Sequence, residues 1–355
     1  MKDSCLVDEM YMRRCLELAR KAARRVSPNP MVGAVIVCDG KIIGEGYHRE
    51  WGGPHAEVNA IASVKDESLL KESTIYVSLE PCSHWGKTPP CAQLIIDKGL
   101  KKVVVGAEDP FISVSGRGIR MLKDAGIDVK VGVIPDECKA LNKAFYSKQV
   151  RQRPYVCLKW AQTADGYIDI KREKGDGNAP LAISSTLGRV AVHELRSRFA
   201  SILVGWNTAM LDNPKLDIRF WSGKGPLRVV IDKDNSLVKE LNIFDGSSPT
   251  LIMTSEHPEG AAPHNVNYEV IDFEKDVEAQ ILSKLAYRGV DSLLVEGGAK
   301  TLQGFIDNGL WDEARIEYGN KTIGDGIEAP SIKGTYKKYH KIGQSRILEL
   351  ENTLL

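Results

Sequence analysis

The stretch Trp51-Gly-Gly-Pro-His55-Ala-Glu57, continued by Glu80-Pro-Cys82-Ser-His-Trp-Gly-Lys87-Thr-Pro-Pro-Cys91, decides the fold expected for the first half of the chain. It holds three strong metal ligands, His55, Cys82 and Cys91. Three protein ligands leave a tetrahedral Zn²⁺ one open position, which a catalytic zinc keeps for water. Glu57 then has a task that a structural zinc does not offer, because it can move a proton between that water and a leaving group. The pattern predicts a catalytic zinc site with Glu57 as general acid and base.

The residues around these ligands predict the elements that present them. His55 opens a predicted helix after Pro54, and Thr74 to Leu79 form a predicted buried strand. Cys91 opens a second helix after two prolines. His55 and Cys91 would then lie at helix N-termini, where the positive end of the dipole favours thiolate. His-x-Glu, then Pro-Cys and a later Cys, is the arrangement of zinc deaminases.

A structural zinc site with His84 as the fourth ligand is the alternative, since His84 lies between the two cysteines. Structural sites usually have more closely spaced ligand pairs and need no neighbouring glutamate. The order of the residues therefore favours the catalytic interpretation.

Composition narrows the class of protein. A chain of 355 residues is long enough for about two domains. Its 48 basic and 47 acidic residues leave a net charge of +1, which gives no electrostatic footprint for nucleic acid or an anionic membrane. The seven cysteines suggest no disulfide framework, and neither a signal-peptide pattern nor a membrane-length apolar run is present. We therefore expect a cytoplasmic protein without nucleic-acid or membrane partners.

Periodicity predicts an α/β protein. Asp8 to Arg25 has the spacing of an amphipathic helix, and Met31 to Cys38 that of a buried strand followed by an Asp-Gly hairpin. From there strands alternate with helices, which indicates a sheet with helices on its faces. The polar, basic stretch from Lys148 to Pro154 marks a boundary. We therefore expect one domain over residues 1–150 and a second over residues 151–355.

The second half carries weaker signals. A buried strand from Asp291 runs through Gly297-Gly298 into a helix, where free N–H groups could hold phosphate. A tight strand-to-helix turn is an equally common explanation for such a glycine pair. Arg196 and Arg219 are candidates for bidentate phosphate binding. These residues alone indicate an anion- or nucleotide-binding α/β domain.

Further motifs resemble a known family. They are Ser27-Pro-Asn-Pro-Met-Val-Gly33, Gly46-Tyr-His48, Leu158-Lys-Trp-Ala-Gln-Thr-Ala-Asp-Gly166, Ile183-Ser-Ser, Val192-His-Glu-Leu-Arg196, Val204-Gly-Trp-Asn-Thr208, Leu211-Asp-Asn-Pro-Lys-Leu-Asp-Ile-Arg219 and Val295-Glu-Gly-Gly298. With the zinc motif, they resemble the bifunctional riboflavin-biosynthesis deaminase/reductases over nearly the whole chain. The eight residues between Cys82 and Cys91 differ from the Cys-x-x-Cys of nucleic-acid deaminases.

The resemblance implies a cytidine-deaminase-like first domain and a dihydrofolate-reductase-like second domain. The first would use zinc to deaminate 2,5-diamino-6-(5-phosphoribosylamino)pyrimidin-4-one. The second would use NADPH to reduce the ribose of the product, 5-amino-6-(5-phosphoribosylamino)uracil, to a ribityl chain. The family also implies a homo-oligomer.

The resemblance assigns residues by position. Asn29, His48 and Lys87 would hold the first substrate, with Lys87 near its phosphate. Lys159 and Glu296 would be catalytic and flank the reacting sugar. The second substrate would be bound by Ser184, Arg196, Leu216, Arg219 and Glu296, and NADPH by Ala161, Thr208, Asp212, Gly297 and Gly298.

The sequence departs from the family at several positions. The chain has Asp109-Pro-Phe111-Ile where the family often has Asp-Pro-Asn-Pro. Pro180 and Ala182 replace a usual serine and tryptophan. Two other functions compete with the bifunctional one: a deaminase of free nucleotides with a degenerate second domain, and a zinc-stabilised binding module. Glu57 argues against the binding module. The retained Lys159, Arg196, Arg219 and Glu296 argue against degeneration.

Overall fold

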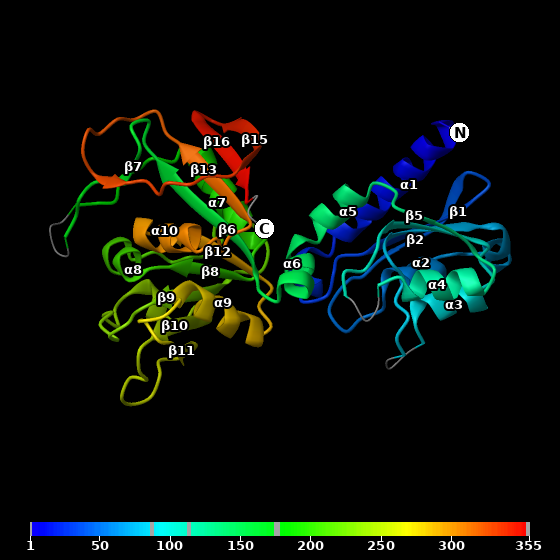
Figure 1. Cartoon of the computed structure of the whole chain (residues 1–355), viewed down its shortest axis with the longest axis horizontal. Helices are drawn as coiled ribbons and strands as arrows, with labels where there is room; N and C mark the ends of the chain where they lie inside the picture. The colour runs from blue at the N-terminus through cyan, green and yellow to red at the C-terminus, as the bar shows by residue number, and fades with distance from the viewer. Residues whose placement is uncertain (1, 86–88, 112–114, 174–177, 353–355) are drawn as a thin grey trace. The chain divides into compact units, whose positions relative to one another are not determined.

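The computed structural model describes residues 2–85, 89–111, 115–173 and 178–352. The chain divides into two compact units, Met1–Gln152 and Arg153–Leu355, each with its own sheet (Figure 1). Among the described residues, no helix combines the length and the apolar character needed to span a bilayer.

The first unit is built on a five-stranded sheet in the order β2-β1-β3-β4-β5. The strands are β1 (Gly33–Cys38), β2 (Lys41–Tyr47), β3 (Thr74–Leu79), β4 (Lys102–Ala107) and β5 (Asp128–Val131). The predicted hairpin joins β1 to β2, because Asp39 and Gly40 adopt the positive φ angles of such a turn. β3, β4 and β5 run parallel, so their carboxyl ends meet at one edge of the sheet.

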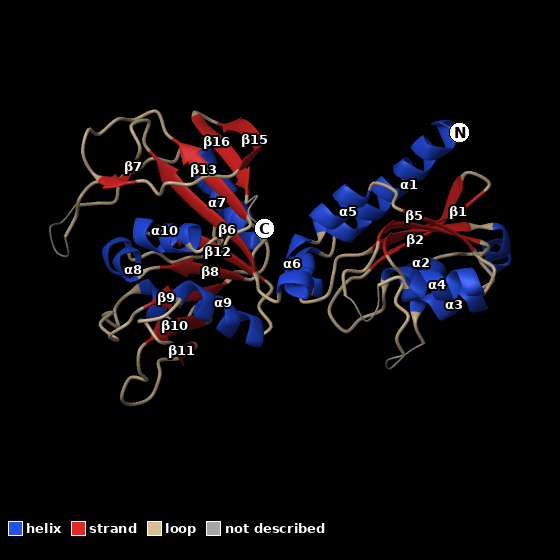
Figure 2. Ribbon diagram, in the orientation of Figure 1, coloured by secondary structure: helices blue, strands red, loops and turns tan. Residues whose placement is uncertain are grey.

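Helices cover both faces of this sheet (Figure 2). α1 (Lys2–Arg20) and α5 (Pro135–Leu141) pack on one face, where Met12 and Leu16 meet Val35 and Val104. The other face is covered by α2 (Ala56–Ala62), α3 (Cys91–Asp97) and α4 (Arg117–Asp124). Short 3₁₀ turns, η1 (Ala23–Val26) and η2 (Glu67–Glu72), complete the connections. The predicted α/β class is confirmed for this unit.

One local prediction was wrong in its bounds. The helix expected over Asp8 to Arg25 begins at Lys2 and ends at Arg20, because Ala23 adopts a φ of +45° that breaks the helical path before η1. The polar stretch from Lys148 to Pro154 begins within α6 (Lys143–Arg151), and the two compact units part inside it, between Gln152 and Arg153.

The second unit holds a nine-stranded sheet in the order β11-β10-β9-β8-β12-β6-β13-β16-β15. Its strands, with the separate pair β7 and β14, are β6 (Tyr155–Gln162), β7 (Tyr167–Asp169), β8 (Ser201–Val204), β9 (Leu227–Ile231), β10 (Thr250–Thr254), β11 (Val266–Val270), β12 (Ser292–Gly297), β13 (Glu313–Tyr318), β14 (Ile327–Glu328), β15 (Thr335–Ile342) and β16 (Ser345–Glu351). The first seven strands in this order, from β11 to β13, all pair in parallel. β16 and β15 then extend the sheet with antiparallel pairing. β6 therefore lies between β12 and β13.

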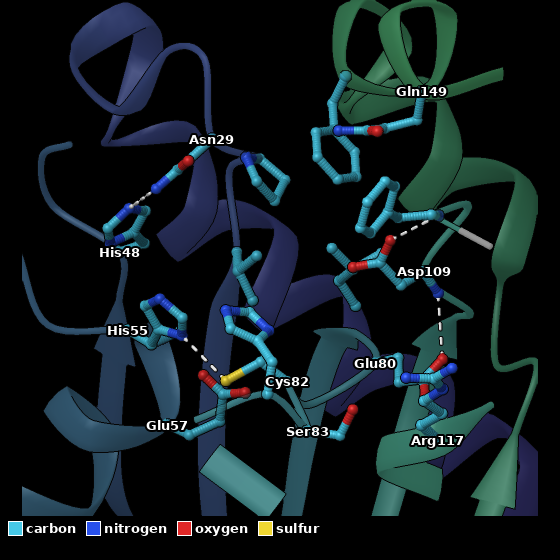
Figure 3. A pocket seen from close by; sticks show the side chains of 17 residues that line it. Asn29, His48, His55, Glu57, Glu80, Cys82, Ser83, Asp109, Arg117 and Gln149 are labelled. Atoms are coloured by element: carbon cyan, nitrogen blue, oxygen red, sulfur yellow. Dashed lines mark hydrogen bonds between the residues drawn. The ribbon is translucent and has the colours of Figure 1, made fainter. Parts of the chain in front are cut away.

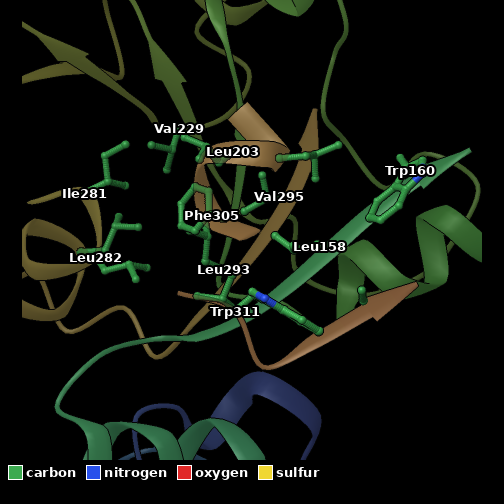
Figure 4. Close-up of a cluster of buried hydrophobic side chains, with 14 of the residues drawn as sticks. Leu158, Trp160, Leu203, Val229, Ile281, Leu282, Leu293, Val295, Phe305 and Trp311 are labelled. Carbon is green, nitrogen blue, oxygen red and sulfur yellow. The ribbon is translucent and has the colours of Figure 1, made fainter. Parts of the chain in front are cut away.

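Both faces of this sheet are also covered. α9 (Val277–Tyr287) and α10 (Ala299–Asp307) close a core around Leu158, Phe305 and Trp311 (Figure 4). On the opposite face, α7 (Thr186–Ser197), α8 (Trp206–Asp212) and η3 (Asn242–Phe244) pack around Ile202 and Leu294. Because side chains alternate along β6, Leu158 enters the first core and Lys159 faces α7.

Candidate active sites

Three chain segments bring the predicted zinc ligands together. His55 is the N-terminal cap of α2, Cys82 follows the carboxyl end of β3, and Cys91 is the first residue of α3. α2 lies close against β2, because Gly46 has no side chain: a Cβ there would lie 2.2 Å from the backbone nitrogen of Ala60. This close approach sets the position of the helix that carries His55 and Glu57.

The three ligand atoms have the spacing that a metal ion requires. His55 Nδ1 lies 3.6 Å from Cys82 Sγ and 3.4 Å from Cys91 Sγ. Tetrahedral zinc, with bonds of about 2.3 Å to sulfur and about 2.0 Å to nitrogen, places such atoms about 3.5 Å apart. All three ligand atoms lie within 4.8 Å of one another. A Cys₂His donor set with this spacing fits zinc.

Hydrogen bonds distribute protons unequally over the three ligands. Bonds from Cys91 and His55 outweigh burial and lower the pKa of the Cys82 thiol to about 4. Cys82 accepts a hydrogen bond from the Cys91 thiol, which raises the pKa of Cys91, and burial adds to that shift. The bond to Cys82 also raises the pKa of His55 to about 9. One thiolate is thus already favoured, and metal binding would release the protons of the other two ligands.

Glu57 lies beside this group (Figure 3). It is only 3% exposed, and burial raises the pKa of its carboxyl group. Glu57 and the ligands His55 and Cys82 line one cavity of about 570 Å³. His84, the fourth ligand of the structural-zinc alternative, is exposed and does not belong to the ligand group found among the described residues. The geometry therefore leaves one side of the metal position to the cavity.

Asn29 and His48 form a hydrogen-bonded pair on the cavity wall (Figure 3). His48 Nδ1 lies 3.1 Å from the carbonyl oxygen of Pro54, to which it donates in the tautomer that this contact requires. Its Nε2 then accepts from Asn29 Nδ2 at 3.3 Å. Burial lowers the pKa of His48, in agreement with a neutral ring. The pair presents an oriented amide to the cavity.

Glu80 is a buried residue whose role the sequence did not indicate. Its carboxylate accepts hydrogen bonds from four backbone N–H groups, those of Asp109, Gly116, Gly118 and Ile119. It thereby joins the end of β3 to the segment that runs from Asp109 into the first turn of α4.

Other cavity residues were not among the predicted site residues, although Phe111 was noted as a departure from the family pattern. Asp109, Phe111 and Arg117 line the cavity from this segment, and Phe145 and Gln149 do so from α6. The adjacent carboxyl ends of β3 and β4 could have indicated the first three, since sites form at such edges. No signal indicated the residues of α6. Lys87 lies outside the described residues.

In the second unit, Lys159, Glu296 and Arg196 gather around the middle of the sheet. The Arg196 guanidinium makes two hydrogen bonds to the Glu296 carboxylate, at 2.8 and 2.6 Å. Burial raises the pKa of Glu296, but the charge and hydrogen bonds of Arg196, together with the charge of Lys159, outweigh burial and lower the pKa overall. Burial lowers the pKa of Lys159, against the opposing charge of Glu296. Arg196, predicted to bind substrate, thus also orients Glu296.

The residues predicted to bind the cofactor differ in their surroundings. Thr208 faces the glycine pair, since a Cβ on Gly298 would lie 3.2 Å from Thr208 Oγ1. Gly297 adopts a φ of +135°, which requires glycine. Ala161 lies on β6, two residues after Lys159. Asp212 is paired with the buried Arg172, which also binds Asp169.

The remaining predicted substrate residues lie around α7 and the segment after α8. Ser184 Oγ donates to the carboxylate of Glu317 at 2.7 Å. Leu216 is buried, with a φ of +52°. Arg219 is half exposed, pairs with Asp217 and lies 5.0 Å above the ring of Phe220. Arg219 is therefore the more accessible of the two predicted phosphate-binding arginines.

The fold and the site of the first unit define a zinc-binding deaminase, joined here to a second unit of the reductase type. Residues 6–107 match the model of the cytidine and deoxycytidylate deaminase zinc-binding region, and residues 154–352 match the RibD C-terminal domain. The chain belongs to the RibD family of bifunctional deaminase/reductases in riboflavin biosynthesis.

Individual relatives cover nearly the whole chain. The riboflavin biosynthesis protein RibD of Aquifex aeolicus strain VF5 is 36% identical, over 96% of this chain and 98% of the relative. That of Escherichia coli strain K12 is 34% identical, over 97% and 99%.

Solved structures agree. A diaminohydroxyphosphoribosylaminopyrimidine deaminase/5-amino-6-(5-phosphoribosylamino)uracil reductase from Thermotoga maritima is 37% identical, with a TM-score of 0.87 over 98% of this chain and 99% of that one. RibD of Acinetobacter baumannii has a TM-score of 0.86 at 29% identity, over 98% and 99%. The predicted family and fold class are confirmed.

Proposed function

We propose that this chain catalyses two consecutive steps of riboflavin biosynthesis, with one active site in each unit. Residues 1–150 would deaminate 2,5-diamino-6-(5-phosphoribosylamino)pyrimidin-4-one, and residues 151–355 would reduce the ribose of the product with NADPH. The observation that carries the first step is the buried Glu57 beside three clustered ligands, two of which, His55 and Cys82, line the same cavity as Glu57. The name of the similar Thermotoga maritima enzyme supports both substrates.

In the deaminase, His55, Cys82 and Cys91 would hold zinc. Zinc held there supplies the Lewis acidity that makes water acidic near neutral pH. Glu57 takes the proton of the attacking water and delivers it to the departing amine, so that a C–O bond forms, the C–N bond breaks and ammonia leaves. Its burial next to the ligands keeps competing water away from that proton transfer.

Substrate recognition would use the rest of the cavity. The Asn29 amide, oriented by His48, can hydrogen-bond to the pyrimidine edge. Of the described residues that line the cavity, Arg117 alone carries a permanent positive charge, so it can share the substrate phosphate with Lys87.

In the reductase, Lys159 and Glu296 would flank the sugar. The bond between C1′ and the ring oxygen breaks, and Lys159 gives that oxygen a proton. Ala161, Thr208, Asp212 and the Gly297–Gly298 turn would hold NADPH, which would supply the hydride that C1′ takes up. Ser184, Arg196, Leu216 and Arg219 would position the substrate. We also expect a cytoplasmic homo-oligomer.

The test is to supply the diaminopyrimidine substrate with NADPH and zinc, and to follow ammonia release and NADPH oxidation separately. Both signals are expected, with ammonia release preceding NADPH oxidation. Ammonia release alone would indicate a deaminase with a degenerate second unit. Neither signal from zinc-loaded protein would indicate a binding module and overturn the proposal.

A further inference from the structure

Glu317 on β13 is a buried carboxylate that the two proposed reactions do not use. It is 2% exposed, and its Oε2 accepts the hydrogen bond from Ser184 Oγ. Its Oε1 is buried and has no hydrogen-bond partner in the described structure. Buried carboxylate oxygens are nearly always paired, so an unpaired one calls for a functional explanation.

Strand register places Glu317 on the same face as Lys159. β6 pairs in parallel with β13, with Lys159 opposite Arg315 and Ala161 opposite Glu317. On the other side of β6, Val295 lies opposite Leu158, so Glu296 is level with Lys159. Paired residues, and residues two apart along a strand, share one face of a sheet. Lys159 is therefore flanked by a carboxylate on each neighbouring strand.

α7 closes this face over the two side chains. Lys159 and Glu317 line a small cavity of about 10 Å³ together with Gly188 and Val192 of α7. That volume has room for one water at most. A Cβ on Gly188 would lie 2.7 Å from Glu317 Oε1, so the absence of a side chain there makes room for the carboxylate. The carboxylate lies at the first turn of this 12-residue helix, where the dipole favours negative charge.

We propose that Glu317 is a positioning residue of the reductase site, which fixes the Ser184 hydroxyl and, together with Glu296, holds the Lys159 ammonium in its charged form. The proposal rests on the reductase function proposed above. Because the Ser184 proton is committed to Glu317, Ser184 can only accept hydrogen bonds from a ligand, and a sugar hydroxyl is a suitable donor. Glu317 thus acts through Ser184 and Lys159 and need not touch the reacting atoms.

The charges around Lys159 give the expected pH dependence. Burial lowers the pKa of Lys159, Glu296 and Glu317 raise it, and Arg196 and Arg315 lower it. A protonated Lys159 is present below its pKa and is lost as the pH rises through it. Removing the Glu317 charge should therefore move the alkaline limb of the reduction profile to lower pH.

The test compares wild type, Glu317→Gln and Glu313→Gln, each labelled with ¹³C at the lysine ε-carbon. Glu313 is a matched control, because it lies on the same strand and bonds Tyr155 but does not line the Lys159 cavity. The Lys159 signal is assigned with Lys159→Arg and titrated by NMR. In Glu317→Gln its pKa should fall by about one unit, the lower end of the effect of a nearby opposite charge. The control should titrate like wild type.

Activity supplies the second readout. With the deaminated intermediate and NADPH, kcat/KM should fall at least about tenfold in Glu317→Gln, while ammonia release stays within about twofold. An unshifted Lys159 titration in a folded Glu317→Gln protein overturns the proposal. If that variant does not fold, Glu317→Asp replaces it: a smaller shift in the same direction supports the proposal, and no shift overturns it. A wild type that cannot oxidise NADPH overturns the reductase function instead, because the titration needs no turnover.

Discussion

At the scale of single residues, Glu57 gains its chemical role from what surrounds it. Its backbone lies in the first turn of α2, whose cap is His55, so the carboxylate and the histidine ligand approach the same point from one helix end. Burial removes competing solvent from the carboxylate and raises its pKa. A proton carrier is thereby placed next to the metal position without being part of the ligand set.

Glu57→Gln should leave zinc bound and lower deamination at least about 10²-fold, the usual contribution of general acid–base catalysis. The amide keeps the size of the side chain but cannot carry the proton. Metal analysis and ammonia release measure the two effects. Glu50→Gln is the control, since Glu50 is exposed in the same segment and should change neither quantity. Loss of zinc from the Glu57 variant would show that Glu57 is a ligand.

The sequence indicated the residues of the first site better than those of the second. Few residue types bind zinc, and His55, Cys82 and Cys91 lie within 37 residues of one another, so chemistry and spacing restrict the choice. Lys159, Glu296 and Glu317 come together only through the pairing of β12, β6 and β13. No local pattern encodes that pairing, so Glu317 could not be found before the strand order was known.

At the scale of elements, the contact of α2 with β2 fixes the zinc site. A Cβ on Gly46 would lie 2.2 Å from Ala60 N and 2.5 Å from Ala56 O, both atoms of the α2 backbone. Backbone cannot yield as a flexible side chain can. A side chain at Gly46 must therefore move the helix that begins just after His55.

Gly46→Ala should lower both stability and zinc occupancy. Overpacking of this kind costs about 1–3 kcal/mol, and displacement of α2 should misplace His55 against the two cysteines. Thermal unfolding and zinc content are the measurements. Gly225→Ala is the matched control, because a Cβ there meets no atom within 4 Å and Gly225 has no positive φ. Normal zinc content in Gly46→Ala would show that α2 can shift without affecting the site.

Element prediction succeeded where apolar residues repeat, and it indicated no strand where they do not. β3 occupies the residues predicted for it, and β1 lies within the predicted stretch from Met31 to Cys38, because both are largely apolar runs buried on two faces. β15 has the sequence Thr-Tyr-Lys-Lys-Tyr-His-Lys-Ile and is mostly exposed at the edge of its sheet, so burial left no pattern in it. Its pairing with β16 supplies the missing constraint.

At the scale of the whole molecule, each unit has hydrophobic cores of its own. The four buried clusters found in the described part of the chain each draw their residues from one unit, two from Met1–Gln152 and two from Arg153–Leu355. The proposed zinc residues all lie in the first unit and the proposed reductase residues in the second. The two activities should therefore be separable by mutation.

Cys82→Ser should abolish ammonia release yet leave NADPH-dependent reduction of the deaminated intermediate within a few-fold of wild type. Serine is a poor zinc ligand, and hydride transfer requires no metal. Circular dichroism must show that the protein is folded, and Cys5→Ser, at an exposed cysteine, serves as the control. Lys159→Ala should give the reciprocal result. A folded Cys82→Ser protein that cannot reduce the intermediate would contradict the division into two sites.

The four backbone hydrogen bonds to Glu80 have a consequence for how this family can diverge. One carboxylate holds Asp109 on one side and Gly116, Gly118 and Ile119 on the other, so both ends of the intervening segment have fixed positions. That attachment uses backbone N–H groups, so side chains between the two ends can change without releasing it. Phe111, at a position where the resemblance to the family places an asparagine, is a change of that kind: it alters the cavity wall while the strand that leads to Cys82 keeps its anchor.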